Sequence, residues 1–345
     1  MDPLTNPFSP GAGAPPPELA GRGEILHTAR VALHRIRAGR PEKGQMLLGL
    51  RGVGKTVLLN RISEFAEEMG YLVVQIEAPE GQQLPKYLAP ALKSVLLRLS
   101  TVDRAKDYAV RALGALRGFA SAFKVSVGEI ELGVSEPQTA DSGNMEVDLP
   151  ELLLAMGYAA KAAETSVAIC IDEVQYLTET DLRGLIVAMH RIAQKGLPVI
   201  LFGAGLPQVA ALAGDAKSYA ERLFDYPDVG PLTDTEAARA VREPVHDQGA
   251  EISVGALQRI VDVTRGYPSS VRLEVEALQR ISSRSFARSV GRRLHRLRYV
   301  SFPRRGQGRE TLGCADCTTL NTRSLVLSTM TTGSAQTGSK KCGLP

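Results

Sequence analysis

Positions 49 to 56 of the chain read Gly49-Leu50-Arg51-Gly52-Val53-Gly54-Lys55-Thr56, a glycine-rich run that ends in lysine and threonine. The apolar segment 46–50 leads into this run, and residues 55–68 follow it with apolar side chains at helical spacing. We therefore expect a buried strand, a glycine loop and a helix in immediate succession. This is the order in which a loop can present its backbone to phosphate groups at a helix N-terminus.

The spacing Gly-x4-Gly-Lys-Thr is that of a P-loop, in which the backbone matters as much as the side chains. Gly52 and Gly54 allow backbone conformations that a Cβ would hinder, so successive N–H groups can turn inward around an anion. Lys55 is expected to neutralise β- and γ-phosphate oxygens, and the Thr56 hydroxyl to ligate Mg²⁺. A glycine turn with a surface lysine is the alternative interpretation. The predicted ATP contacts in this run and directly after it are Gly49, Leu50, Arg51, Gly52, Val53, Gly54, Lys55, Thr56 and Val57.

Two carboxylates, Asp172 and Glu173, directly follow the apolar run 167–171. The carboxyl edge of a parallel sheet is where open α/β folds bind their ligands. Asp172 is suited to hold Mg²⁺, usually through a coordinated water, and Glu173 to orient and polarise the attacking water. Such a pair alone is as typical of a helix cap as of a metal site, but its combination with the P-loop favours catalysis. Gln175 could contact the same water or be a surface polar residue.

Strands and helices alternate along most of the chain. Besides 46–50, strands are predicted at 71–76, 167–171, 198–202 and, as an edge strand, 226–229. Helical periodicity covers the segments 23–38, 55–68, 84–99, 104–119, 149–163 and 182–194. The alternation predicts an α/β fold, a P-loop three-layer sandwich whose parallel sheet is covered on both faces.

The chain divides into four predicted parts. Residues 1–18, rich in proline and glycine, predict a flexible arm, and residues 19–231 the α/β core. Alternating residues near 124–134 suggest a small hairpin inserted into that core. Residues 232–282 predict a small helical subdomain, and residues 283–345 a basic, disordered tail.

The tail differs in charge from the rest of the chain. From position 280 to the last residue there are 13 Lys and Arg against only Glu310 and Asp316, within a chain that totals 41 basic and 37 acidic residues. A basic arm for nucleic acid or another polyanion is one interpretation, and a disordered segment without a fixed partner is the other.

Composition excludes several classes of protein. With 44% hydrophobic and 23% charged residues the chain has a globular profile, and no stretch reaches the roughly 18 uninterrupted apolar residues of a membrane span. The first residues lack the basic and apolar regions of a signal peptide. Four cysteines in a chain of this length do not form a disulfide framework. We expect a cytoplasmic protein without membrane contact.

The P-loop and the acidic pair, together with Leu19-Ala20-Gly21-Arg22 and Ser218-Tyr219-Ala220-Glu221-Arg222-Leu223-Phe224, resemble an AAA-type ATPase of the group allied to archaeal and origin-recognition ATPases. The resemblance extends over about residues 19–268. It implies a sheet order of 5-1-4-3-2 and a small C-terminal helical lid. It also implies that Gly21 and Arg22 contact the base side of the nucleotide.

The same resemblance makes Arg222 an arginine finger, a cation that neutralises charge building on the γ-phosphate and is commonly supplied by a neighbouring subunit. A plain surface arginine is the alternative. The chain departs from the family pattern at three places. Gly23 follows Arg22 where the family usually has an acidic residue. Ser269 and Ser270 stand where a lid arginine normally follows the proline, and the predicted fourth strand ends in Gly203-Ala204-Gly205 where many relatives have a polar sensor residue.

The leading hypothesis is a Mg²⁺-dependent ATPase that couples its ATP or ADP state to a macromolecular partner not identified by the sequence. One alternative is a nucleotide-gated binding or regulatory module with little turnover, suggested by the missing sensor residue. Another is a DNA-associated initiator or transposition-type ATPase, suggested by the resemblance and the basic tail. A homo-oligomer follows if Arg222 acts on a neighbouring subunit.

Overall fold

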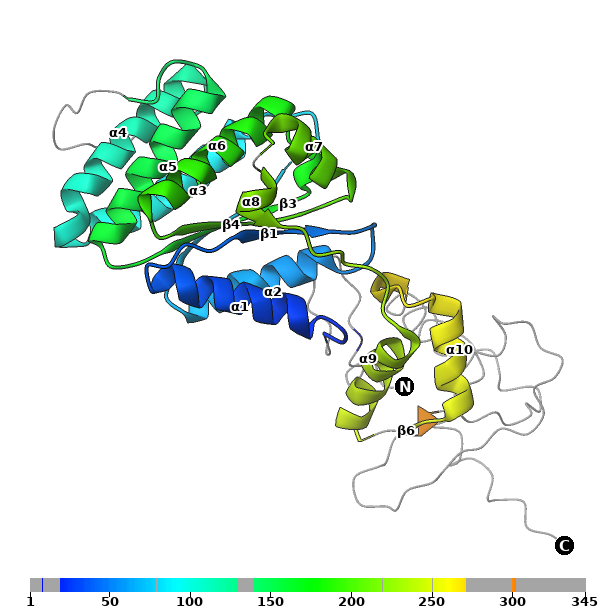
Figure 1. Ribbon diagram of the computed structural model, residues 1–345. Coiled ribbons are helices and arrows are strands. Elements are labelled where there is room, and N and C mark those ends of the chain that lie inside the picture. The colour runs from blue at the N-terminus through cyan, green and yellow to red at the C-terminus, as the bar shows by residue number, and fades with distance from the viewer. Residues whose placement is uncertain are drawn as a thin grey trace, which may run out of the picture. The chain divides into compact units, whose positions relative to one another are not determined.

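The computed structural model describes residue 8 and residues 19–78, 80–128, 139–218, 220–249, 251–270 and 300–301. Contacts divide the chain into two compact units. The larger comprises Glu24–Arg51 and Lys55–Gly230, and the smaller comprises Met1–Gly23, Gly52–Gly54 and Pro231–Pro345. Figure 1 shows the elements of both units.

The larger unit is built on a five-stranded parallel sheet. Its order is β2-β3-β4-β1-β5, which read from the other edge is the predicted 5-1-4-3-2. The strands are β1 (Gly44–Leu48), β2 (Leu72–Glu77), β3 (Val167–Asp172), β4 (Val199–Gly205) and β5 (Phe224–Asp225). Every residue of β1, β3 and β4 is buried, as expected for central strands covered on both faces. The predicted α/β fold is confirmed.

Helices form a layer on each face of the sheet (Figure 1). The helices α1 (Gly23–Arg37) and α2 (Lys55–Glu68) lie on one face. On the other face lie α3 (Pro85–Ser100), α4 (Lys106–Ala122), α5 (Met145–Ala162), α6 (Glu179–Lys195), α7 (Gln208–Ala216) and α8 (Ala220–Leu223). Apolar side chains of this second layer and of the sheet form the main core. Among the helices that the structure describes, none combines the length and hydropathy needed to cross a bilayer.

Two helices of the second layer begin earlier than periodicity predicts. The N-terminal turn of α5 is capped by Asn144, whose side chain accepts a hydrogen bond from the Glu146 amide at 3.0 Å. The N-terminal turn of α6 carries a capping box in which Thr178 and Asp181 each accept from the other's backbone amide. These caps add helical residues ahead of the first periodic apolar positions.

The edge strand β5 begins at Phe224, two residues before the start of the predicted segment 226–229. Phe224 and Asp225 pair with Gly44 and Gln45. The chain then pairs again only at Asp228, opposite Leu48. Pro227 stands between the two contacts and has no N–H to donate, so the strand is interrupted there.

The smaller unit contains α9 (Asp234–Asp247) and α10 (Val254–Thr264), with the short strand β6 (Glu251–Ile252) paired to β7 (Val300–Ser301). Phe8 is buried in this unit with a cluster that also contains Val241, Val245 and Leu257. The domain limits stay predictions. Except for Phe8 and residues 300–301, the predicted arm 1–18 and tail 283–345, with its suggested DNA contact, lie outside the described residues.

The hairpin predicted near 124–134 also stays a prediction. Residues 125–128 follow α4 without forming a strand. The rest of the segment, from residue 129 onward, lies outside the described part of the chain.

Candidate functional site

The glycine run 49–56 joins the end of β1 to the start of α2. Gly52 and Gly54 have φ of 83° and 94°, in the left-handed region that glycine adopts without strain. Gly49 is fastened to the neighbouring strand, because its amide donates to the Gly205 carbonyl at 3.2 Å. Lys55 is 7% exposed, and its ammonium donates to the Leu50 carbonyl at 2.9 Å. The lysine is therefore folded back over the loop that carries it.

The acidic pair ends the central strand β3. Asp172 is 9% exposed and accepts a hydrogen bond from the Glu173 amide at 2.8 Å through Oδ1. Glu173 is half-buried and has a left-handed backbone, with φ 52° and ψ 39°. This conformation is uncommon for a residue with a Cβ and costs about 1–3 kcal/mol, which the surrounding structure must offset. The chain thus turns sharply directly after Asp172.

Sheet order places the loop and the acids at the same edge. Only β4 separates β1 from β3, so the ends of these two strands are about 10 Å apart at about 4.8 Å per strand. A long lysine side chain and a triphosphate can bridge such a gap. The structure thus brings the predicted residues Lys55, Asp172 and Glu173 together within the larger unit.

The charges of Asp172 and Glu173 affect the pKa of Lys55. Burial lowers the pKa of the Lys55 ammonium below its usual value. The carboxylates of Glu173 and Asp172 oppose this shift by favouring the charged amine, and Arg51 adds to it. A polyanion beside Lys55 would supply the further negative charge that stabilises the ammonium.

The oxygen atoms at this edge are of the kind that Mg²⁺ takes as ligands. Thr56, the second residue of α2, is half-buried and offers a hydroxyl, and Asp172 offers a carboxylate. Within the described ranges, no group of three or more His, Cys, Asp or Glu residues could hold a metal by itself. Mg²⁺ does not need such a cage, because it commonly takes one or two protein ligands and completes its shell with phosphates and waters.

Gln175, left open by the sequence, is part of this edge. It lies in the 3-10 turn η3 (Val174–Tyr176) that follows Glu173. Its Nε2 donates to Oε2 of Glu173, and its Oε1 accepts from the Leu206 amide at 3.1 Å. The next residue, Tyr176, accepts a hydrogen bond from the Arg51 guanidinium at 2.8 Å through its hydroxyl. Sequence alone gave no signal for these contacts, because the Leu206 and Arg51 partners are far away along the chain.

Gly21 and Arg22 lie in the smaller unit. Arg22 is 8% exposed and donates to the Val53 carbonyl of the glycine run at 3.2 Å. A Cβ on Gly21 would collide with the carboxylate of Glu236 in α9 at 2.5 Å from its nearest atoms. The pKa of Glu236 is lowered chiefly by hydrogen bonds with Thr233, and Arg22 adds to the effect. Arg22 thus contacts the Val53 backbone within the smaller unit, and its contact with the base stays a prediction.

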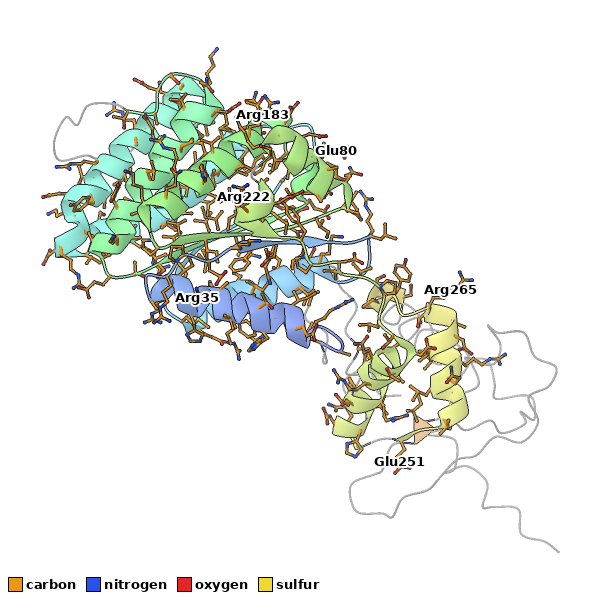
Figure 2. The ribbon with its side chains drawn as sticks, in the orientation of Figure 1. Arg35, Glu80, Arg183, Arg222, Glu251 and Arg265 are labelled. Carbon is orange, nitrogen blue, oxygen red and sulfur yellow. The ribbon has the colours of Figure 1, made fainter. Side chains whose placement is uncertain are left out.

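The structure does not place Arg222 near the other candidate residues. It is exposed on α8, directly before β5 (Figure 2). Phe224 pairs with Gly44, the first residue of β1, whereas the P-loop follows the last one. The five residues of β1 span about 13 Å at about 3.3 Å per residue. Arg222 instead lines a hollow of about 220 Å³ with Arg40, among other residues.

Comparisons with known proteins agree with this architecture. A family model described as an AAA ATPase domain matches residues 18–202. None of the curated proteins matches the chain. Cdc6p from Pyrobaculum aerophilum is a similar solved structure, with 14% identity, a TM-score of 0.51, and coverage of 84% of this chain and 66% of that one.

Two further solved structures have lower TM-scores. The Orc1 protein of Aeropyrum pernix, solved in complex with DNA, is 15% identical over 78% of this chain and 62% of that one, with a TM-score of 0.47. A Walker-type ATPase of Pyrococcus abyssi is 16% identical over 82% of this chain and 78% of that one, with a TM-score of 0.45. The chain spans less than two thirds of the length of the Cdc6p and Orc1 structures. At such identities the likeness concerns the fold.

Proposed function

The chain belongs to the AAA ATPase domain family, and from this premise we propose that it binds ATP with Mg²⁺ at residues 49–57 and hydrolyses it to ADP and phosphate. The change from ATP to ADP is then the signal to which a macromolecular partner responds. The observation that carries the proposal is the convergence of Lys55, Asp172 and Glu173 at one edge of the sheet, where both carboxylates influence the Lys55 pKa.

Each residue has a distinct task in this reaction. Lys55 exchanges the Leu50 carbonyl for phosphate oxygens and neutralises their charge. Thr56 and Asp172 would hold Mg²⁺, which supplies positive charge next to the β- and γ-phosphates when it is bound. Glu173 accepts a proton from the attacking water as the water oxygen bonds to the γ-phosphorus. The bond from that phosphorus to the bridging oxygen breaks, and ADP leaves.

Phosphate release by the full chain tests this function. With saturating ATP and Mg²⁺ we expect steady turnover, and EDTA should lower it by about 100-fold or more because several kcal/mol of charge stabilisation are lost. Restoring Mg²⁺ should restore the rate. Absence of ATP binding, measured by calorimetry in the presence of Mg²⁺, would contradict the proposal.

The end of β4 supports a second candidate, a nucleotide-gated module in which occupancy rather than turnover sets the conformation. The strand ends in Gly205, so no side chain of its own can contact a γ-phosphate or water there. Tight ATP binding without phosphate release, both in the unmodified chain and in Glu173→Gln, would favour this candidate over the ATPase.

The position of Arg222 bears on oligomeric state. We propose that this arginine serves the nucleotide site of a second copy of the chain, since it is about one strand length away from its own P-loop. A cation supplied in this way neutralises charge in the transition state, and its effect on turnover is commonly 10³- to 10⁵-fold.

Arg222→Ala should therefore reduce turnover by at least about 100-fold at saturating ATP and change ATP affinity by less than about threefold. The rate per subunit of the unmodified chain should rise with protein concentration. Arg40→Ala is the matched control, because Arg40 is exposed and lines the same hollow. A rate that is independent of concentration and unchanged in Arg222→Ala would contradict a shared site.

A further inference from the structure

Strand β4 ends at the edge of the sheet where Lys55, Asp172 and Glu173 lie, and its last residue, Gly205, offers no polar side chain there. Gly203 and Gly205 are two residues apart, so the positions where their side chains would stand are on the same face of the strand. A Cβ on Gly203 would approach Met46 and would lie 3.1 Å from Cγ2 of Val174. A Cβ on Gly205 would lie 3.0 Å from Oε1 of Gln175 and 2.9 Å from Val209. Because neither glycine has a side chain, η3 can occupy the space beside the end of β4.

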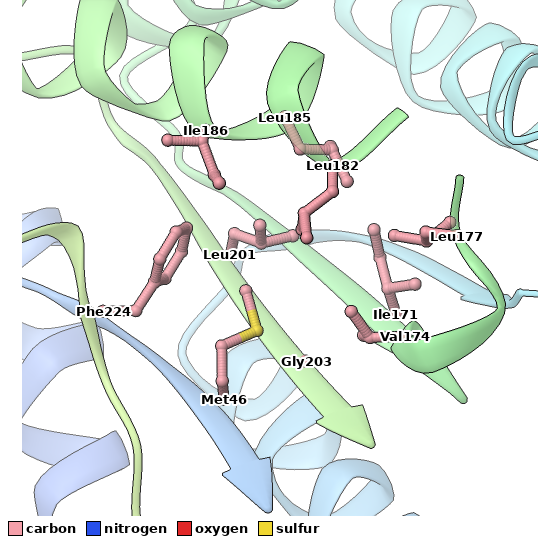
Figure 3. A pocket seen from close by; sticks show the side chains of 10 residues that line it. All are labelled: Met46, Ile171, Val174, Leu177, Leu182, Leu185, Ile186, Leu201, Gly203 and Phe224. Atoms are coloured by element: carbon pink, nitrogen blue, oxygen red, sulfur yellow. The ribbon is translucent and has the colours of Figure 1, made fainter. Parts of the chain in front are cut away.

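The turn η3 is held in this space on both sides of Gln175. Val174 is buried and lies with Ile171 and Leu177 around a small apolar cavity of about 10 Å³ (Figure 3). On the other side, the Tyr176 hydroxyl accepts from Arg51 of the P-loop. Gln175 is half-buried and lies between these two anchored neighbours.

The hydrogen bonds of Gln175 determine the orientation of its amide. The Leu206 backbone N–H can only donate, so it requires the oxygen of the amide, at 3.1 Å. The amide nitrogen is then directed to the Glu173 carboxylate, which can only accept when it is ionised. One side chain consequently connects the candidate general base to the first residue after β4.

We propose that Gln175 is a positioning residue for ATP hydrolysis, which holds the Glu173 carboxylate against the end of β4 and supplies, from η3, the polar group that Gly205 lacks. This inference rests on the proposed ATPase function. A carboxylate held by an amide donor keeps one oxygen engaged, which restricts the directions in which the other can receive a proton from water. Loss of the amide leaves Glu173 chemically intact but free to turn.

Three variants test the proposal by ATP turnover and by Mg·ATP affinity. Gln175→Ala should lower kcat by about 10- to 100-fold and leave affinity within about threefold, because orientation and not binding is lost. Gln175→Glu replaces the amide donor with a second carboxylate against Glu173, so it should lower kcat at least as far as Gln175→Ala does. Gln194→Ala, an exposed glutamine on α6, is the control and should behave like the unmodified chain.

Gly205→Ser gives a readout that a merely structural role would not produce. In the unmodified chain the added side chain displaces the Gln175 amide, so kcat should fall. In Gln175→Ala the added Cβ no longer meets the amide, although it still lies 2.9 Å from Val209, so the same change should lower kcat by a clearly smaller factor than in the unmodified chain. ATP binding by each variant confirms that it is folded.

The outcomes separate this inference from the function on which it rests. If the unmodified chain shows no Mg²⁺-dependent turnover, the ATPase proposal fails and the inference fails with it. If the unmodified chain turns over ATP, and Gln175→Ala and Gln175→Glu do so at the same rate, only the role of Gln175 is overturned.

Discussion

Lys55→Ala is expected to weaken Mg·ATP binding by about 100-fold or more. The ammonium is buried at the start of α2 and would contact phosphate oxygens of two groups. Hydrogen bonds to charged groups contribute about 1.5–3 kcal/mol each, and about 1.4 kcal/mol corresponds to tenfold in affinity. Calorimetric titration with ATP in excess Mg²⁺ measures the loss. Lys106→Ala, which removes an exposed lysine at the start of α4, should leave the affinity unchanged.

The pH dependence of binding gives a second check on Lys55. Burial lowers the lysine pKa in the free protein, and phosphate oxygens would raise it in the complex. Binding therefore takes up a proton at pH values between the free and bound pKa, so affinity should fall as the pH rises through that window. Lys55→Ala should lack this dependence. An affinity in Lys55→Ala equal to that of the unmodified chain would show that the triphosphate is held elsewhere.

Glu173→Gln is expected to reduce ATP turnover by about 10²- to 10⁴-fold while ATP binding remains within about threefold. The amide has the size of the carboxylate but cannot accept the proton of the attacking water. It can still accept a hydrogen bond from Gln175 through its oxygen, so the local structure should persist. Single-turnover phosphate release, at ATP occupancy confirmed by titration, measures the effect.

The matched control for this change is Glu64→Gln, an exposed carboxylate on α2 that pairs with Arg61. It should hydrolyse ATP at the rate of the unmodified chain. Turnover in Glu173→Gln that equals this rate would mean that another group activates the water.

Local sequence was sufficient for the elements whose signals are local. The helix 55–68 was predicted with the bounds of α2, because the glycine run fixes its start and apolar periodicity its length. Apolar periodicity alone predicts a start of α6 that is three residues late, although Thr178 and Asp181 have the spacing of a capping box. The sheet order was available only through the family resemblance, since periodicity identifies strands and not their neighbours.

The candidate site likewise contains residues with a local sequence signal and residues whose position depends on distant parts of the chain. Lys55, Asp172 and Glu173 were predicted from motifs that each occupy a few consecutive residues. The role of Gln175 could not be decided from sequence, because its Leu206 partner is 31 residues away and becomes a neighbour only when β4 pairs beside β3. The separation of Arg222 from the P-loop likewise depends on the register between β5 and β1.

A crystal structure of the full chain with Mg²⁺ and a non-hydrolysable ATP analogue tests the central claim most directly. We expect β- and γ-phosphate oxygens at about 2.7–3.2 Å from Nζ of Lys55. We also expect a metal ion bound to the Thr56 hydroxyl and held by Asp172, directly or through water. A nucleotide bound away from residues 49–57, or a metal ion with no connection to Asp172, would contradict this claim.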